Sequence, residues 1–166
     1  YNTAVGVNTL DAITTGDYNT VFGYNAGSAV TIGAQNVLVG DNAGVATTSG
    51  AANVAIGSDA LNTNIDGSNN VAIGRQAGSS FEPATAFDGG HTYVGHQAGR
   101  LNTVGINNTG VGFMAGYNPS GNYNTFVGSE AGRGATSSAA HSNIAVGRQS
   151  SFSLTSGYQN VTAGYK

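Results

Sequence analysis

The chain has 166 residues, of which 39% are hydrophobic, only 8% are charged and 27 are Gly, and its formal net charge is −3. Its five Lys and Arg residues form no cluster, which argues against a nucleic-acid-binding domain, and no apolar run approaches the roughly 20 residues of a membrane-spanning helix. The low net charge argues against disorder, whereas apolar residues that are mostly Ala and Val are poor material for a round core. The sequence therefore predicts an ordered but elongated protein.

One pattern recurs ten times along the chain, mostly at intervals of 17 residues: Asn, a β-forming residue, a variable residue, an aliphatic residue and Gly. We number the positions of each unit from the Asn. Position 1 is held by Asn2, Asn19, Asn36, Asn53, Asn70, His91, Asn108, Asn124, Asn143 and Asn160. Position 5 is held by Gly6, Gly23, Gly40, Gly57, Gly74, Gly95, Gly112, Gly128, Gly147 and Gly164. A fixed period of this length is typical of a solenoid in which each repeat forms one coil.

Each unit is expected to begin with a short strand at positions 2–4, from residues 3–5 in the first unit to residues 161–163 in the last. Positions 2 and 4 carry mostly Thr, Val and Ile, and position 3 is miscellaneous. Because alternate residues of a strand point to one side, positions 2 and 4 share a face. We interpret their β-branched and aliphatic side chains as an interior stripe. Position 3 would then lie on the opposite face of the strand, which restricts the residue type less. The Gly at position 5 is expected to end the strand at a corner.

The rest of each unit is polar and glycine-rich, apart from a column of small residues at position 8. That column reads Thr9, Ala26, Ala43, Ala60, Ala77, Ala98, Ala115, Ala131 and Ser150. It implies a close approach of two backbones, either across the roll or between chains. Equivalent residues of successive coils are expected to stack at about 4.8 Å, so that the Asn residues of position 1 form a ladder of side-chain amides. We favour this structural role of the Asn residues over a ligand-binding one.

The repeat Asn-Val-Ala-Ile-Gly-x-x-Ala, at residues 53–60 and 70–77, resembles the head repeat of YadA-like trimeric autotransporter adhesins. The related Asn-Thr-x-x-Gly-x-x-Ala-Gly units at residues 19–27 and 124–132 resemble the shafts of phage tail fibres and tailspikes. The resemblance covers nearly the whole chain. It implies an all-β, left-handed parallel β-roll of about ten 17-residue coils. It also implies that three such chains associate side by side as a homotrimer. A core of Val and Ala buries little apolar area in one chain, which also favours association.

The resemblance implies that residues 1–166 are a single β-roll domain and a segment of a longer fibrous protein. The longer, glycine-rich coil favours a phage tail fibre or tailspike in the virion, contacting a host-surface glycan. The alternative is a bacterial adhesin head at the cell surface that binds the host surface or matrix. A passive rigid spacer is a third interpretation. An ice-binding solenoid is a fourth, although position 2 mixes Thr with Val and Ile.

An insertion at residues 79–90 makes one coil four residues longer and precedes the replacement of the ladder Asn by His91. Insertions in repeat proteins map to loops, where recognition concentrates. Aromatic rings there are suited to stacking on sugars, and carboxylates to accepting hydrogen bonds from hydroxyl groups. The candidate receptor-binding residues are Phe81, Glu82, Phe87, Asp88 and Tyr93. The alternative is a loop that packs its Phe residues onto the roll or a neighbouring chain.

No catalytic, metal-binding or cofactor-binding site is predicted. Glycoside cleavage needs two carboxylates at a defined separation, and the two Glu residues, Glu82 and Glu130, lie about three coils apart. The pair of Glu82 and Asp88 is the one local exception. The three His residues show no metal-binding spacing. The chain is therefore interpreted as a non-enzymatic structural protein.

Overall fold

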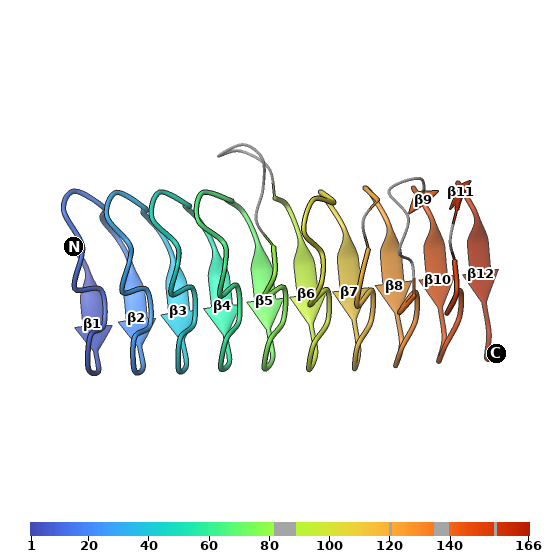
Figure 1. The fold of residues 1–166 in the computed structure, drawn as a ribbon, viewed down its shortest axis with the longest axis horizontal. Coiled ribbons are helices and arrows are strands. Elements are labelled where there is room, and N and C mark those ends of the chain that lie inside the picture. Colours follow the sequence, from blue (N-terminus) through green and yellow to red (C-terminus); the bar gives the residue numbers. More distant parts are fainter. Residues whose placement is uncertain (82–88, 120, 135–139, 155) are drawn as a thin grey trace.

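The computed structural model describes residues 1–81, 89–119, 121–134, 140–154 and 156–166. Ten three-residue strands, one per coil, form a single parallel sheet along an elongated rod (Figure 1). These strands are β1 (Thr3–Val5), β2 (Thr20–Phe22), β3 (Val37–Val39), β4 (Val54–Ile56), β5 (Val71–Ile73), β6 (Thr92–Val94), β7 (Thr109–Val111), β8 (Thr125–Val127), β10 (Ile144–Val146) and β12 (Val161–Ala163). A second, two-stranded sheet pairs β9 (Ala140–His141) with β11 (Gly157–Tyr158).

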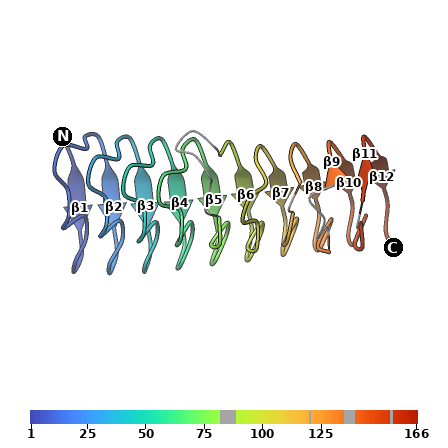
Figure 2. The same cartoon turned by 45° about the horizontal axis from the view of Figure 1, so that its top comes forward.

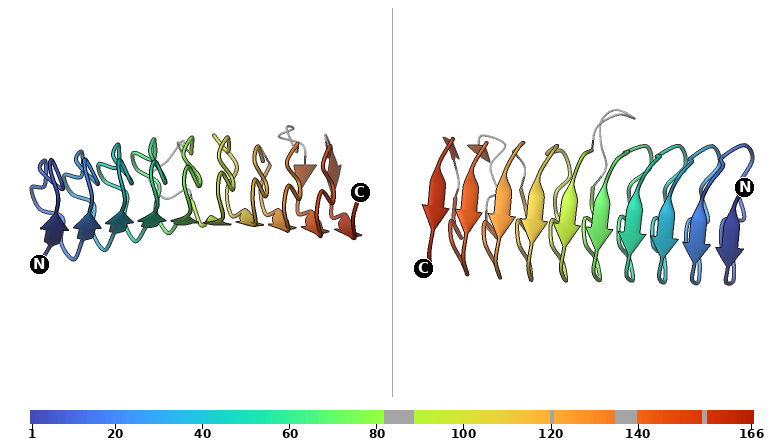
Figure 3. Two further views of the ribbon diagram at one scale, coloured as in Figure 1. Left: turned by 90° about the horizontal axis from the view of Figure 1, so that it is seen from below. Right: turned by 180° about the vertical axis from the view of Figure 1, so that it is seen from behind.

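The coils stack in register, so that equivalent positions of the repeat lie directly above one another. Val54 of β4 pairs with Val71 of β5, and Ile56 pairs with Ile73. The register also survives the insertion, since Ile73 pairs with Val94 across it. Figures 2 and 3 show the strands along one side of the rod, with the rest of each coil folded back on the other side. The predicted all-β parallel roll with 17-residue coils is confirmed, and ten strands at about 4.8 Å give a rod of roughly 45 Å.

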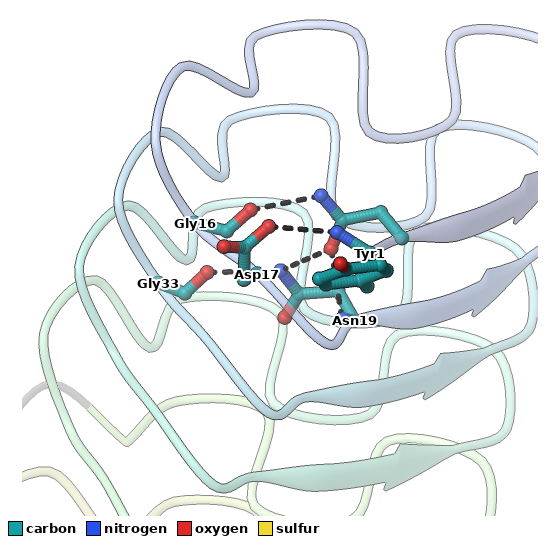
Figure 4. A network of polar contacts seen from close by, with 6 residues as sticks. Tyr1, Gly16, Asp17, Asn19 and Gly33 are labelled. Carbon is teal, nitrogen blue, oxygen red and sulfur yellow. Dashed lines mark hydrogen bonds and ion pairs between the residues drawn. The ribbon is translucent and has the colours of Figure 1, made fainter.

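The Asn residues of position 1 form the predicted ladder. Oδ1 of Asn2 accepts hydrogen bonds from the backbone N–H (2.8 Å) and the side-chain amide (3.1 Å) of Asn19, whose amide also donates to the carbonyl of Gly33 at 2.9 Å (Figure 4). The same bonding recurs along the roll, up to Asn160. Seven ladder residues, Asn19, Asn36, Asn53, Asn70, Asn108, Asn124 and Asn143, are at most 1% exposed. Buried in this way, these seven amides tie successive coils together and present nothing to a ligand.

The structure reverses the predicted orientation of the strands. Position 3 is the interior one: Val21, Leu38, Tyr93 and Phe126 are fully buried there. Positions 2 and 4, which we interpreted as the interior stripe, are partly or fully exposed in every strand of the large sheet. The predicted alternation of side chains along the strand is confirmed, but the prediction that positions 2 and 4 face the interior is wrong. Val, Ile and Thr suit either face of a strand, so their β propensity did not identify the interior.

The residue at position 9 explains how the narrow interior of the roll accepts residues as different in size as Gly and Tyr at position 3. Where position 3 holds a ring, position 9 holds Gly: a Cβ on Gly99 would collide with the ring of Tyr93, and one on Gly132 with the ring of Phe126. Where position 3 holds Ala, position 9 can hold a large residue, and Leu61 packs in the same core as Ala55. The Ala column of position 8 is buried within the single chain. Its small size therefore reflects close packing across the roll.

Position 7 adopts a left-handed backbone in every coil from Asn8 to Gln149, where φ lies between 51° and 58°. Asn tolerates this conformation better than most residues, and Met114 is the least suited occupant of the column. Replacing Met114 by Asn is expected to raise the free energy of unfolding by about 0.5–1 kcal/mol, because it relieves backbone strain. Denaturant unfolding of both proteins measures the difference. A lower stability of the variant would show that packing of the Met side chain outweighs the strain.

Candidate functional site

The structure places two of the five predicted receptor residues in the interior. Phe81 and Tyr93 are both 0% exposed, so the prediction that their rings stack on sugars is wrong. Tyr93 occupies position 3 of β6, which points inward, and Phe81 packs against the roll at the start of the insertion. Glu82, Phe87 and Asp88 lie outside the described residues, so their part of the prediction stays a prediction.

Phe81 and Tyr93 belong to a buried cluster around His91. The ring of Phe81 meets that of His91 edge-on, with centroids 4.5 Å apart, and Tyr93 stacks on His91 at 5.0 Å. The side-chain amide of Asn102 donates to the Tyr93 hydroxyl at 2.9 Å. Burial raises the pKa of Tyr93 and keeps its hydroxyl neutral. The cluster anchors the coil that carries the insertion. Phe81 packs onto the roll, as the alternative expects of the Phe residues of the loop, and Phe87 lies outside the described residues.

His91 takes the place of an Asn in the ladder. Its backbone N–H donates to Oδ1 of Asn70 at 3.1 Å, and its Nδ1 accepts from the backbone N–H of Asn108 at 3.2 Å. Nδ1 thus does what Oδ1 of Asn does elsewhere, which requires a neutral ring with its proton on Nε2. Burial lowers the pKa of His91 from 6.5 to about 4, and hydrogen bonds with the backbone of Asn108 and Gly105 offset this only in part.

The outer face of the large sheet is exposed, flat and apolar. We call it the outer sheet face. It consists of positions 2 and 4 of the ten strands, all of which are Thr, Val, Ile, Phe or Ala, without a charged residue. Val5 is 57% exposed, Ile56 and Ile73 are each 36% exposed, and Val146 is 44% exposed. Sequence reasoning found these columns but assigned them to the interior.

The surface between position 7 and position 10, on the returning part of the coils, is hollowed in two places. We call this column of the surface, from position 7 to position 10 of each coil, the return groove. One hollow in coils four and five is lined by Asp59, Gln76, Asn62 and Ser79, with Thr63 and Ser80 of position 11. A second hollow, in the last two coils, is lined by Gln149, Phe152 and Lys166. Position 7 also forms an amide ladder on the surface, as in the 2.8 Å bond from Gln97 to Gln76.

Cations and rings alternate along position 10 in the second half of the roll. The guanidinium of Arg133 lies between two rings, 5.9 Å from the centre of Tyr117 and 5.7 Å from that of Phe152. Arg100 lies 6.0 Å from the ring of Tyr117 and donates to its hydroxyl at 3.0 Å, and the Lys166 ammonium lies 5.2 Å from Phe152. Arg100, Tyr117, Arg133 and Phe152 all fall on position 10, whereas Lys166 falls on position 7. Their unequal spacings of 17, 16 and 19 residues hide the common position in the sequence.

Other chemistry has little support in the described part of the chain. Within it, no group of three His, Asp or Glu side chains is placed to hold a metal ion. Glu130 forms an ion pair with Arg133 (3.5 Å), and its pKa is lowered mainly by a hydrogen bond from the Gln149 amide at 3.0 Å, so it is suited to hold a cation in place. None of the residues in the described ranges forms a helix of the length and hydropathy that a membrane span needs.

Comparisons of the chain with protein-family models, with curated proteins and with solved structures found no match. The fold and the geometry of its surfaces are therefore the basis of the functional proposal.

Proposed function

We propose that this chain forms the rigid part of a homotrimeric fibre that contacts a host surface, as the shaft of a phage tail fibre or tailspike in the virion. A bacterial adhesin head at the cell surface is the alternative host context for the same assembly. The observation that carries the proposal is the outer sheet face, because an apolar surface of this extent calls for a partner. The partner is a second and third copy of this chain, packed side by side.

The size of the outer sheet face supports association. Ten strands at about 4.8 Å and two side-chain columns give a strip on the order of 500 Å², a size at which an exposed apolar patch marks an interaction site. The strip follows the rod from β1 to β12, so copies aligned with their axes parallel would cover it over its full length. Side chains of Val, Ile and Thr in straight columns are suited to close packing of one sheet on another.

The interior of the roll supports a mechanical role. The Asn ladder places buried hydrogen bonds between successive coils, and the backbone adds others, such as the 2.8 Å bond from the N–H of Val54 to the carbonyl of Asn70. Each coil contacts its neighbours through regular bonds of this kind, which makes a rod that resists bending. These features favour a spacer or shaft that holds a binding end away from its base.

Reversing the polarity of the outer sheet face is the direct test. The double substitution Ile56→Lys and Ile73→Lys is expected to convert a trimer into a monomer, because two adjacent strands of each chain would bring charges into the contact. Sedimentation velocity measures the oligomeric state. Ser129→Lys adds one Lys two residues beyond the end of β8, outside this face, and we expect it to leave the trimer intact. A monomeric wild-type chain at tens of micromolar would overturn the proposal.

Ice binding is a second candidate, because the Thr and Val residues of position 2 point outward on a flat, evenly spaced sheet. This arrangement corrects the orientation that we expected from the sequence. Thermal hysteresis and ice-recrystallisation assays test it directly. Activity that is lost on Val54→Lys would favour an ice-binding protein over a fibre, whereas an inactive protein that forms a trimer would favour the fibre.

A further inference from the structure

The charges of the chain are separated along the rod. Residues 1–66 contain five Asp and no Lys or Arg, which gives −5, and residues 67–166 contain all five Lys and Arg against three acidic residues, which gives +2. Since sequence order follows the rod axis, one half of the rod is negative and the other positive. The negative half repels an anionic ligand and the positive half attracts it, so the charge pattern selects a position along the rod.

Carboxylate partners for these cations are scarce. Among the described residues, Arg133 with Glu130 is the one side-chain ion pair between a cation and a carboxylate. Arg100 has no described carboxylate partner, although it lies in the return groove. Arg133 remains 38% exposed beside Glu130. Arg100 therefore adds positive charge to the groove that no described carboxylate neutralises, whereas Arg133 shares its charge with Glu130.

The rings of position 10 orient these cations. Tyr117 lies between Arg100 and Arg133, so that the guanidinium groups are held near ring surfaces. A guanidinium held in this way keeps N–H groups at its edge that can bind a carboxylate in a bidentate manner. Two coils separate Arg100 from Arg133, a distance of roughly 10 Å along the rod at one strand spacing per coil.

The rest of the groove lining suits sugar hydroxyl groups. The hollow in coils four and five lies where the negative and positive halves meet. It presents Asn62, Thr63, Gln76 and Ser80, whose amides and hydroxyls both donate and accept hydrogen bonds. Lysine and arginine are too sparse along the groove for a nucleic acid, in which every residue carries a phosphate. A lining of amides and hydroxyls, with the single carboxylate of Asp59 and widely spaced cations, fits a polymer of sugars in which only some units are charged.

We propose that the positive half of the return groove binds a linear polysaccharide bearing carboxylate groups, laid along the rod axis, with Arg100 and Arg133 each contacting one carboxylate. This deepens the proposed function, since it rests on the chain being a host-contacting fibre and names the class of its receptor. It also moves the receptor site away from the buried Phe81 and Tyr93. The groove lies on the returning part of the coils, so a trimer built through the outer sheet face leaves it accessible.

Fluorescence anisotropy with a labelled hyaluronan decasaccharide, which carries one carboxylate per disaccharide, tests the proposal on the intact chain. We expect binding that weakens as the salt concentration rises. The double variant Arg100→Gln and Arg133→Gln is expected to lose at least tenfold in affinity. Arg75→Gln removes an exposed cation at position 6, outside the groove lining, and should stay within twofold of the wild type. Circular dichroism verifies that each variant is folded.

Three outcomes would overturn the proposal: no binding at low salt, equal losses in the Arg75 and groove variants, or equal binding of the carboxyl methyl ester of the same oligosaccharide. Tighter binding of an oligothymidylate of similar charge would assign the groove to nucleic acid and also overturn it. Sedimentation velocity on the same sample keeps the two proposals distinct. A trimer that does not bind the oligosaccharide would support the fibre and contradict this receptor. A monomer that binds it would support the site in the return groove and contradict the trimeric fibre.

Discussion

Replacing Asn53 by Ala is expected to lower the free energy of unfolding by about 2–4 kcal/mol, because it opens the Asn ladder in a fully buried place. Oδ1 of Asn53 accepts the backbone N–H and the side-chain amide of Asn70, both at 3.0 Å, and its own amide donates to the carbonyl of Gly67 at 2.8 Å. Without the side chain, the buried N–H of Asn70 loses its acceptor. An unpaired donor of this kind costs about 1–3 kcal/mol.

Denaturant unfolding followed by circular dichroism measures this loss. The matched control is Asn62→Ala in the same coil, since Asn62 is partly exposed and its amide makes one long bond of 3.3 Å to Asp59. We expect the control to change the stability by less than about 0.5 kcal/mol, as is usual for surface substitutions. Equal effects of the two substitutions would contradict a structural role of the buried ladder.

Lowering the pH from 6.5 to 4 is expected to destabilise the roll by about 3 kcal/mol through His91 alone, at about 1.4 kcal/mol per pKa unit. The pKa of His91 is about 4 in the folded chain, against 6.5 for an ordinary His. Between these values the unfolded chain binds the proton and the folded chain does not. The contribution is therefore complete above pH 6.5 and is lost as the pH falls towards 4. Protonation of Nδ1 would also place its N–H opposite the backbone N–H of Asn108, so that two donors would face each other.

The substitution His91→Asn isolates this effect from the other titrating groups, because Asn restores the ladder residue of the repeat and does not titrate. We expect the unfolding free energy of the variant to depend less on pH between 6.5 and 4 than that of the wild type, by about 3 kcal/mol over the interval. Hydroxyl and carboxyl groups elsewhere are the same in both proteins. Parallel pH profiles would show that His91 is protonated in the folded chain, against its burial among Phe81, Tyr93 and Asn102.

The return groove shows why a site can be hidden in a repeat sequence. Arg100 and Arg133 are 33 positions apart, and a 16-residue coil and a 17-residue coil lie between their units. Only after the coils are aligned on their strands do both residues fall on position 10, next to Tyr117 and Phe152. The insertion at residues 79–90 breaks the period, and the sequence therefore predicted the receptor site there. Its first ring, Phe81, is directed into the core.

The sequence by itself determined the architecture. A 17-residue period with Asn at position 1 and Gly at position 5 is sufficient to predict one short strand per coil, the parallel stacking of the coils and the Asn ladder, because each follows from placing identical residues at one strand spacing. Only the tertiary structure decided which side of the strand is the interior. Alternation places positions 2 and 4 together but does not say which way they point, and the interior is set by pairs such as Tyr93 with Gly99, whose combined volume must fit within a single coil.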